Sequence, residues 1–366
     1  MPKSNLHGLA AAGVSVWSDQ ISRQMLDKAE LTQRIEEDAV TGVTSNPTIF
    51  AKAIVGSTDY DDQLRELKAA DLTTEEIVKR LISDDIERAC DILAPVHQAR
   101  GGLDGFVSVE VSPDLAADTE ATMAEARDWV KRVNRPNLLV KVPATPEGIP
   151  AIRRLTGEGI SVNVTLTFSL ERYAEVMEAY IAGIKHLEDI GGELESVFSV
   201  ASFFVSRFDT EVDRRLDEIG TEEALGLKGT TAIANARVAY ERFLHEFGSN
   251  GFGLLAAKGA RPQFPLWAST STKNPDYPDL LYVEGLVAQH TVNTMPLETI
   301  DAYQEHGDAS PRPFTAEDMA EARATLDRLQ EVGVDYDDVV ATLEREGVEK
   351  FASSWHELLE GIEKSG

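Results

Sequence analysis

Short runs of apolar and β-favouring residues recur along the chain, and each is followed by polar or turn residues and then by a helical pattern. Such alternation of strand and helix is typical of βα units and a parallel sheet. In several helical segments apolar residues recur three and four positions apart, as in helices that cover a sheet. The predicted strands are 13–19, 39–46, 105–112, 137–144, 160–167, 196–203, 264–270 and 290–296. This is about the number needed to close a barrel, so the predicted fold class is α/β, a (β/α)8 TIM barrel.

Helical patterns fill most of the gaps between these strands. They cover residues 21–38, 73–100, 118–133, 148–155, 169–190 and 230–247. The gap between the second and third strands is the longest, and we expect additional helices there. Residues after the eighth strand read as further helices packed on the barrel. Because we find no internal repeat, low-complexity linker or shift in composition, we predict one domain over residues 1–366. Its barrel would span about 13–310 and its C-terminal helical extension about 311–366.

Composition limits the classes of partner. The chain of 366 residues is 42% hydrophobic, enough for a substantial core. It carries 63 acidic against 35 basic residues, a net charge of −28. Such a surface repels nucleic acid and anionic membranes at long range, so neither is an expected partner. A phosphate site in this chain would have to be built locally from a few basic residues and backbone amides.

Cysteine and histidine usage argues against disulfides and metals. Cys90 is the only cysteine, and it lies in a helical pattern, which favours a quiet structural thiol over a nucleophile. The seven histidines show no paired ligand spacing, so we expect no metal. The first residues lack a long apolar region, and no segment approaches the ~20 apolar residues of a membrane span. We therefore expect a cytoplasmic protein.

Polar residues gather near the carboxyl ends of the predicted strands. In a barrel of this kind these ends meet at one mouth, where chemistry is assembled. Lys141 is the most informative, because a lysine inside the apolar run 137–144 needs an acidic partner or a task for its free amine. Glu110 alternates with valines in its strand and so points inward or lies at an edge. The residues at these strand ends are Asp19, Asn46, Glu110, Lys141, Asn163, Thr165 and Ser202.

Each of these residues also has an ordinary structural explanation. A lysine on an edge strand can extend its amine to water, which is the alternative for Lys141. Asp19 precedes a helix and could cap it, and Asn46 before a proline could be a turn residue. Arg207 could form a surface ion pair with the nearby acidic residues Asp209 or Asp213, and threonine such as Thr165 is frequent in strands. Lys258 also interrupts apolar residues, but it precedes the seventh strand, and we assign it no chemistry.

Several motifs, in one order, resemble the transaldolases, lysine Schiff-base enzymes of the pentose phosphate pathway with a (β/α)8 barrel. GVTSNPTIF (42–50) is similar to the family's second-strand motif, and NLLVKVPATPEGIPAI (137–152) to its lysine motif. The resemblance runs from about Val14 to Met295. It continues through FVSVEVSPDLAADTEATMAEA (106–126), SVNVTLTFSLERY (161–173), VASFFVSRFDTEVD (200–213) and LWASTSTKNPDY (266–277).

The resemblance implies a role for each candidate residue. Lys141 would form the Schiff base, Asp19 and Glu110 would transfer protons, and Thr165 would help to hold the catalytic water. Asn46 and Asn163 would bind substrate hydroxyls. Ser202 and Arg207 would hold the phosphate, with Phe204 also in the substrate site. The family commonly has an arginine after the seventh strand, and Lys273 is the nearest match, although a lysine lacks the bidentate fork of arginine.

The chemistry of the residues agrees with a Schiff-base mechanism. Burial of Lys141 disfavours its ammonium form and so raises the fraction of amine that can attack a ketose carbonyl. Cleaving the bond between the third and fourth carbons requires a base at the fourth-carbon hydroxyl, and Asp19 is suitable. Glu110, with a water held by Thr165, would serve formation and dehydration of the carbinolamine. By resemblance the substrates are sugar phosphates: sedoheptulose 7-phosphate and glyceraldehyde 3-phosphate would give erythrose 4-phosphate and fructose 6-phosphate.

Three alternatives remain open at this point. A fructose 6-phosphate aldolase-like enzyme would release the three-carbon unit to water. A barrel lysine could hold pyridoxal phosphate, although no further motif indicates a site for this cofactor. A catalytically silent barrel could act as a binding module through its C-terminal helices. The sequence favours the transaldolase reaction, without a metal or an organic cofactor, and leaves open whether the protein is a monomer or a homodimer.

Overall fold

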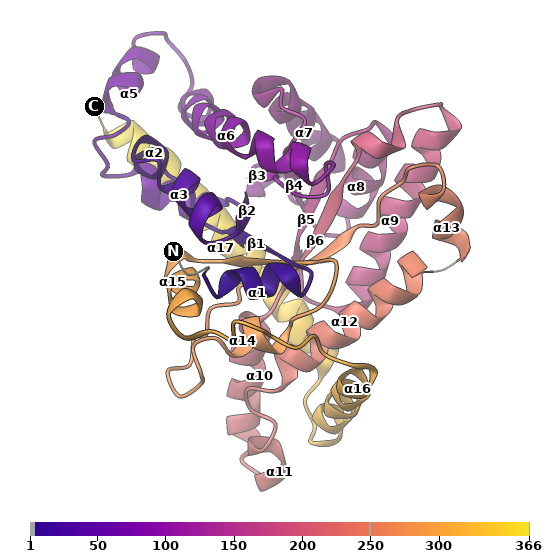
Figure 1. Cartoon of the computed structure of the whole chain (residues 1–366). Coiled ribbons are helices and arrows are strands. Elements are labelled where there is room, and N and C mark those ends of the chain that lie inside the picture. The colour runs from indigo at the N-terminus through magenta and orange to yellow at the C-terminus, as the bar shows by residue number, and fades with distance from the viewer. Residues whose placement is uncertain (1–3, 249, 366) are drawn as a thin grey trace.

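The computed structural model describes residues 4–248 and 250–365, and its centre is a closed parallel barrel (Figure 1). The strands follow one another around the barrel in chain order, and β8 closes it by pairing with β1. The predicted (β/α)8 barrel is therefore confirmed. The strands are β1 (Val14–Ser18), β2 (Val40–Val43), β3 (Val107–Glu110), β4 (Leu138–Pro143), β5 (Val162–Thr167), β6 (Ser199–Phe204), β7 (Phe264–Ala268) and β8 (Thr291–Met295).

Helices surround the barrel. The connection between β2 and β3 is the longest and holds three helices, which confirms the additional helices that the sequence predicts there. One predicted helix is wrong in detail. Residues 21–38 form two helices, because the chain turns at Ala29 with φ 56° in the left-handed region. The helices up to β6 are α1 (Leu6–Ala11), α2 (Arg23–Asp27), α3 (Glu30–Glu37), α4 (Pro47–Ile54), α5 (Asp61–Lys68), α6 (Thr74–Ala99), α7 (Thr119–Val133), α8 (Gly148–Gly157) and α9 (Leu170–Asp189). The later helices are α10 (Ser206–Ile219), α11 (Glu222–Leu225), α12 (Thr231–Gly248), α13 (Asn250–Ala256), α14 (Leu281–Gly285), α15 (Leu297–His306), α16 (Ala316–Glu331) and α17 (Tyr336–Lys364).

Aromatic side chains fill the amino-terminal end of the barrel. Phe106 stacks on Phe198 with ring centroids 4.7 Å apart, and Phe198 in turn meets the edge of Phe264. Trp17 lies against Gly42, where an added Cβ would come within 2.5 Å of the indole ring. Its Nε1–H donates to buried Asp104 over 2.9 Å. This end is therefore a packed floor, which leaves the carboxyl ends of the strands for a site.

The C-terminal extension becomes part of the barrel mouth. Figure 1 shows the long yellow helix α17 running diagonally across the molecule, and its end lies near α5. Helix α17 packs against α4, α6 and α10 and also touches β5. Buried residues of α17, such as Phe351 and Trp355, belong to the same apolar cluster as the strands. We propose that residues 1–366 form one domain, of which residues 1–3, 249 and 366 lie outside the described residues.

The described residues also bear on membranes and metals. In residues 4–248 and 250–365, no helix is long and apolar enough to cross a membrane. The same residues contain no group of three or more side chains placed to hold a metal ion. Cys90 lies in α6 and is buried, and burial raises the pKa of its thiol, so it is placed as the sequence predicted.

Candidate active site

The carboxyl ends of the strands surround a pocket of about 840 Å³. Strand pairing aligns Glu110 with Lys141 and Lys141 with Asn163, so these side chains lie side by side on the inner face. The predicted residues that line the pocket are Asp19, Asn46, Lys141, Thr165, Ser202, Phe204, Arg207 and Lys273. Glu110 and Asn163 lie behind this lining and hydrogen-bond to Lys141 and Ser202. The structure therefore brings together all ten predicted residues.

Lys141 is buried at the base of the pocket. It is 5% exposed, and its strand β4 is paired on both sides, so the edge-strand alternative is wrong. Its Nζ donates to the carbonyl oxygen of Ser45 over 2.9 Å and to Oε2 of Glu110 over 3.0 Å. These bonds fix the position of the amine at the pocket surface, where it can reach a bound carbonyl.

Glu110 points into the barrel and is the acidic partner of Lys141. Its side chain is 5% exposed. Burial raises the pKa of Glu110, while the charges of Lys141 and Arg207 oppose that change. A carboxyl group with a raised pKa accepts a proton more readily, so this pair is suited to proton exchange.

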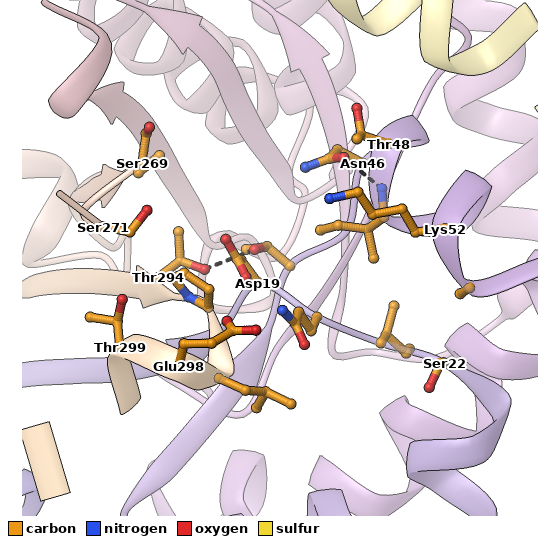
Figure 2. Close-up of a pocket in the computed structure, with 18 of the residues that line it drawn as sticks. Asp19, Ser22, Asn46, Thr48, Lys52, Ser269, Ser271, Thr294, Glu298 and Thr299 are labelled. Carbon is orange, nitrogen blue, oxygen red and sulfur yellow. Dashed lines mark hydrogen bonds between the residues drawn. The ribbon is translucent and has the colours of Figure 1, made fainter. Parts of the chain in front are cut away.

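Asp19 follows β1 and faces the pocket rather than capping a helix. Its N–H donates to the carbonyl of Met295 over 2.9 Å. The cap of α2 is Ser22, whose Oγ accepts from the N–H of Met25, so the capping alternative for Asp19 is wrong. Burial raises the pKa of Asp19 to about 6, although Lys273 and other cations oppose the effect. Figure 2 shows Asp19 near Thr294 in the centre of the pocket.

Asn163, Ser202 and Ser108 form a hydrogen-bonded row inside the barrel. Ser202 Oγ donates to Asn163 Oδ1 over 2.7 Å, and Asn163 Nδ2 donates to Ser108 Oγ over 3.0 Å. In this arrangement the hydroxyl hydrogen of Ser202 is already used. Thr165 differs, because its buried Oγ1 has no hydrogen-bond partner among the described residues. A buried polar atom without a partner is costly, so Thr165 is suited to binding a water or a reacting hydroxyl.

Asn46 combines a structural role with a place in the pocket. Its Oδ1 accepts from the N–H of Ile49 over 3.0 Å and caps α4, with Pro47 in the first turn. The structural role is thus that of a helix cap, whereas the alternative drawn from the sequence was a turn residue. The residue also lines the pocket, and Figure 2 places it beside Thr48 and Lys52 on the side formed by α4.

Arg207 and Lys273 bring positive charge to the pocket. The Arg207 guanidinium lies 5.0 Å from the centre of the Phe204 ring and forms no ion pair with a described residue, so the ion-pair alternative is wrong. Burial lowers the pKa of Arg207, and partial shielding of its amine from water lowers the pKa of Lys273. Lys273 is exposed, and its Nζ donates to Ser271 Oγ over 2.7 Å. Asp209 instead accepts from Thr231 and Tyr282.

Sequence reasoning missed several lining residues, most clearly Lys52, Lys350 and Phe351. Lys52 follows the second-strand motif by a few residues, and the other two lie in α17, far along the chain. Lysines on an amphipathic helix look like ordinary surface residues, so only the three-dimensional path of α17 reveals their place. Lys258, which the sequence excluded, is exposed and pairs with Glu188.

Comparison with known proteins identifies the family to which the chain belongs. The model of the transaldolase/fructose-6-phosphate aldolase family matches residues 16–362. The chain belongs to this family. A protein of Thermobifida fusca named transaldolase is 54% identical over 359 residues, which cover 98% of this chain and 97% of the relative. A transaldolase of Acidothermus cellulolyticus is 53% identical over 98% of this chain and 95% of the relative. A transaldolase of Mycolicibacterium smegmatis is 49% identical over 98% of this chain and 96% of the relative.

Family membership confirms the resemblance drawn from the motifs. Because the match extends to residue 362, it includes nearly all of α17 as well as the barrel. The predicted enzyme class, a transferase with transaldolase function, is confirmed with it.

Proposed function

We propose that Lys141 is the Schiff-base residue of this transaldolase, which reversibly transfers a dihydroxyacetone unit. The donor is sedoheptulose 7-phosphate and the acceptor is glyceraldehyde 3-phosphate, and the products are erythrose 4-phosphate and fructose 6-phosphate. One observation carries the proposal: a buried amine at the base of the pocket donates to the carboxylate of Glu110 over 3.0 Å. This pair places a nucleophile and a proton acceptor in direct contact.

Schiff-base formation begins when Lys141 gives a proton to Glu110 and attacks the ketose carbonyl. The resulting carbinolamine loses water, which requires an acid to protonate its hydroxyl. Glu110 returns the proton, and a water bound by Thr165 Oγ1 relays it. The raised pKa of Glu110 supports this alternation between acid and base. The iminium formed on Lys141 then acts as the electron sink, so the mechanism uses no metal or organic cofactor.

Asp19 is the base of the cleavage step. It removes the proton from the fourth-carbon hydroxyl, the bond between the third and fourth carbons breaks, and its electron pair moves toward the iminium. The aldehyde leaves, and the three-carbon unit stays on Lys141 until an aldose phosphate accepts it by the reverse steps. With a pKa of about 6, Asp19 is ionised at neutral pH but basic enough to accept this proton.

The remaining pocket residues bind and orient the substrate. Asn46 binds a hydroxyl group directly, and Asn163 acts from behind the lining through its bond to Ser202. Arg207 and Lys273 bind the phosphate, with Phe204 stacked beneath the guanidinium. Because Ser202 donates to Asn163, it orients that amide, and it binds the phosphate only if it gives up this bond. The start of α10 offers few free amides for the phosphate, since the N–H groups of Ser206 and Phe208 are already bonded.

The deciding experiment separates transfer from hydrolysis. Fructose 6-phosphate is supplied with and without erythrose 4-phosphate, and release of glyceraldehyde 3-phosphate is followed. Transaldolase activity requires the acceptor, whereas an aldolase releases the aldehyde continuously without it. A silent barrel gives no product in either case. As part of the same proposal the enzyme acts in the cytoplasm, as a monomer or a homodimer.

A further inference from the structure

A second group of cations lines the pocket beyond the residues that the motifs identify. Lys52 comes from α4 and Lys350 from α17, and both are exposed. In residues 4–248 and 250–365, neither amine forms a hydrogen bond or an ion pair. Both amines are therefore free to bind an anion that enters the pocket.

The two helices that carry these lysines are fixed to each other. Helix α17 packs against α4, and the hydroxyls of Thr48 and Ser354 form a hydrogen bond of 2.7 Å between them. Phe351, next to Lys350 in sequence, is 2% exposed, and its ring centre lies 5.8 Å from the Arg207 guanidinium. Buried Phe351 thus fixes the backbone of α17 next to Lys350, while the side chain of Lys350 extends into solvent.

Electrostatics indicates that these cations share one region of the pocket. The pKa of Lys350 is lowered, first by the charge of Arg207 and then by burial and Lys52. Carboxylates do line the pocket, but Figure 2 shows Glu298 beside Asp19, across the pocket from Lys52. Arg207 and Lys52 repel the charge of Lys350, and a bound dianion would relieve that repulsion.

We propose that Lys52 and Lys350 form an outer phosphate position that binds the longer ketose phosphate. This inference rests on the proposed function. The Schiff base fixes the second carbon of every ketose at Lys141, so the phosphate on the seventh carbon of sedoheptulose reaches farther than the phosphate on the sixth carbon of fructose. Arg207 and Lys273 hold the nearer position. The flexible stem of a lysine suits a position that only the longer substrate fills.

The test compares donors of different length in the variants Lys52→Met, Lys350→Met and the double variant. Lys364→Met is the matched control, because it removes the same charge from α17 at an exposed ion pair with Glu360. We expect kcat/KM for sedoheptulose 7-phosphate to fall about tenfold or more in the single variants, as for a lost hydrogen bond to a charged group. The value for fructose 6-phosphate should fall much less, and Lys364→Met should change neither.

Two further measurements make the test decisive. Transfer from fructose 6-phosphate to glyceraldehyde should be almost unaffected in each variant, because neither this donor nor this unphosphorylated acceptor places a phosphate in the outer position. Equal losses with both donors, or losses that extend to unphosphorylated glyceraldehyde, would overturn the outer position, as would unchanged kinetics. Thermal unfolding of each variant reports its folding, which we expect to be preserved because both lysines are exposed and unpaired among the described residues. Borohydride trapping in the unsubstituted enzyme tests the proposed function separately from the outer phosphate position. If no adduct forms on Lys141, the Schiff-base role of Lys141 is refuted, whatever the kinetics of the lysine variants.

Discussion

Lys141 and Glu110 occupy directly paired positions of β4 and β3, and Nζ of the lysine donates to Oε2 of the glutamate over 3.0 Å. Both side chains are almost completely buried, at 6% and 5% exposed. Taking two charges out of water is costly, and a buried pair is weak evidence for a stabilising role. The arrangement is better explained by chemistry, because it places an amine and its proton acceptor in contact at the base of a pocket.

Substitution Glu110→Gln tests this proton exchange. The amide oxygen can still accept from Lys141, so the geometry is kept while the proton acceptor is lost. We expect the rate of Schiff-base formation to fall by about 10²- to 10⁴-fold, the usual contribution of general acid–base catalysis. Quenching with borohydride at successive times measures this rate. An unchanged rate of adduct formation would exclude Glu110 from the step.

Substitution Asp19→Asn should separate two steps of the reaction. The Schiff base still forms, since Lys141 and Glu110 are unchanged, but cleavage lacks its base. We therefore expect the adduct trapped from fructose 6-phosphate to carry all six carbons, whereas the unsubstituted enzyme yields a three-carbon adduct. Intact mass distinguishes the two adducts. A three-carbon adduct formed by the variant at the normal rate would contradict the role of Asp19.

The pKa of Asp19 predicts the acidic limit of activity. Because burial raises it from 3.8 to about 6, the carboxylate needed for cleavage is lost as the pH falls through about 6. The kcat/KM for fructose 6-phosphate should then fall in proportion to the remaining carboxylate. A profile that stays flat down to pH 5 would contradict this assignment.

The same carboxyl group should also affect stability in a pH-dependent way. A raised pKa in the folded state means that the ionised form favours unfolding, so Asp19 opposes folding above pH 6 and has no such effect below its ordinary value of 3.8. Asp19→Asn should therefore raise the free energy of unfolding by about 1–3 kcal/mol at pH 8 and leave it unchanged near pH 3.5. Urea unfolding at the two pH values checks the difference, and an equal effect at both would contradict it.

Gly42→Ala tests the packed floor of the barrel. The added methyl group would lie within 2.5 Å of the Trp17 ring, so Trp17 or its neighbours must move. We expect a loss of about 1–3 kcal/mol in the free energy of unfolding, as for overpacked cores. Gly253→Ala in α13 is the control, because nothing lies within 4 Å of its added methyl group. Similar effects of both substitutions in urea unfolding would show that crowding at Trp17 is unimportant.

The sequence predicted the barrel well because strand and helix patterns depend on local periodicity. The observed β4 lies inside the predicted 137–144, and Lys141 interrupts it visibly. Asn46 shows a limit of such reasoning. The sequence suggests either a structural residue or a substrate ligand, yet Asn46 caps α4 and also lines the pocket. Ser202 shows another limit, since its hydrogen bond to Asn163 depends on how β5 and β6 pair, which the local sequence does not specify.

Lys350 and Phe351 were beyond prediction for a different reason. Their place in the pocket depends on where α17 crosses the mouth of the barrel, and helical periodicity does not specify the path of a helix in space. An exposed lysine in an amphipathic helix carries no signal that distinguishes it from a solvated surface residue.

The most direct test of the central claim is peptide mapping after incubation with fructose 6-phosphate and borohydride. We expect a reduced three-carbon adduct on Lys141, and no adduct on a Lys141→Met variant that retains its fold. Absence of any adduct on the folded, active enzyme, or an adduct on another lysine, would contradict the assignment of Lys141 as the Schiff-base residue.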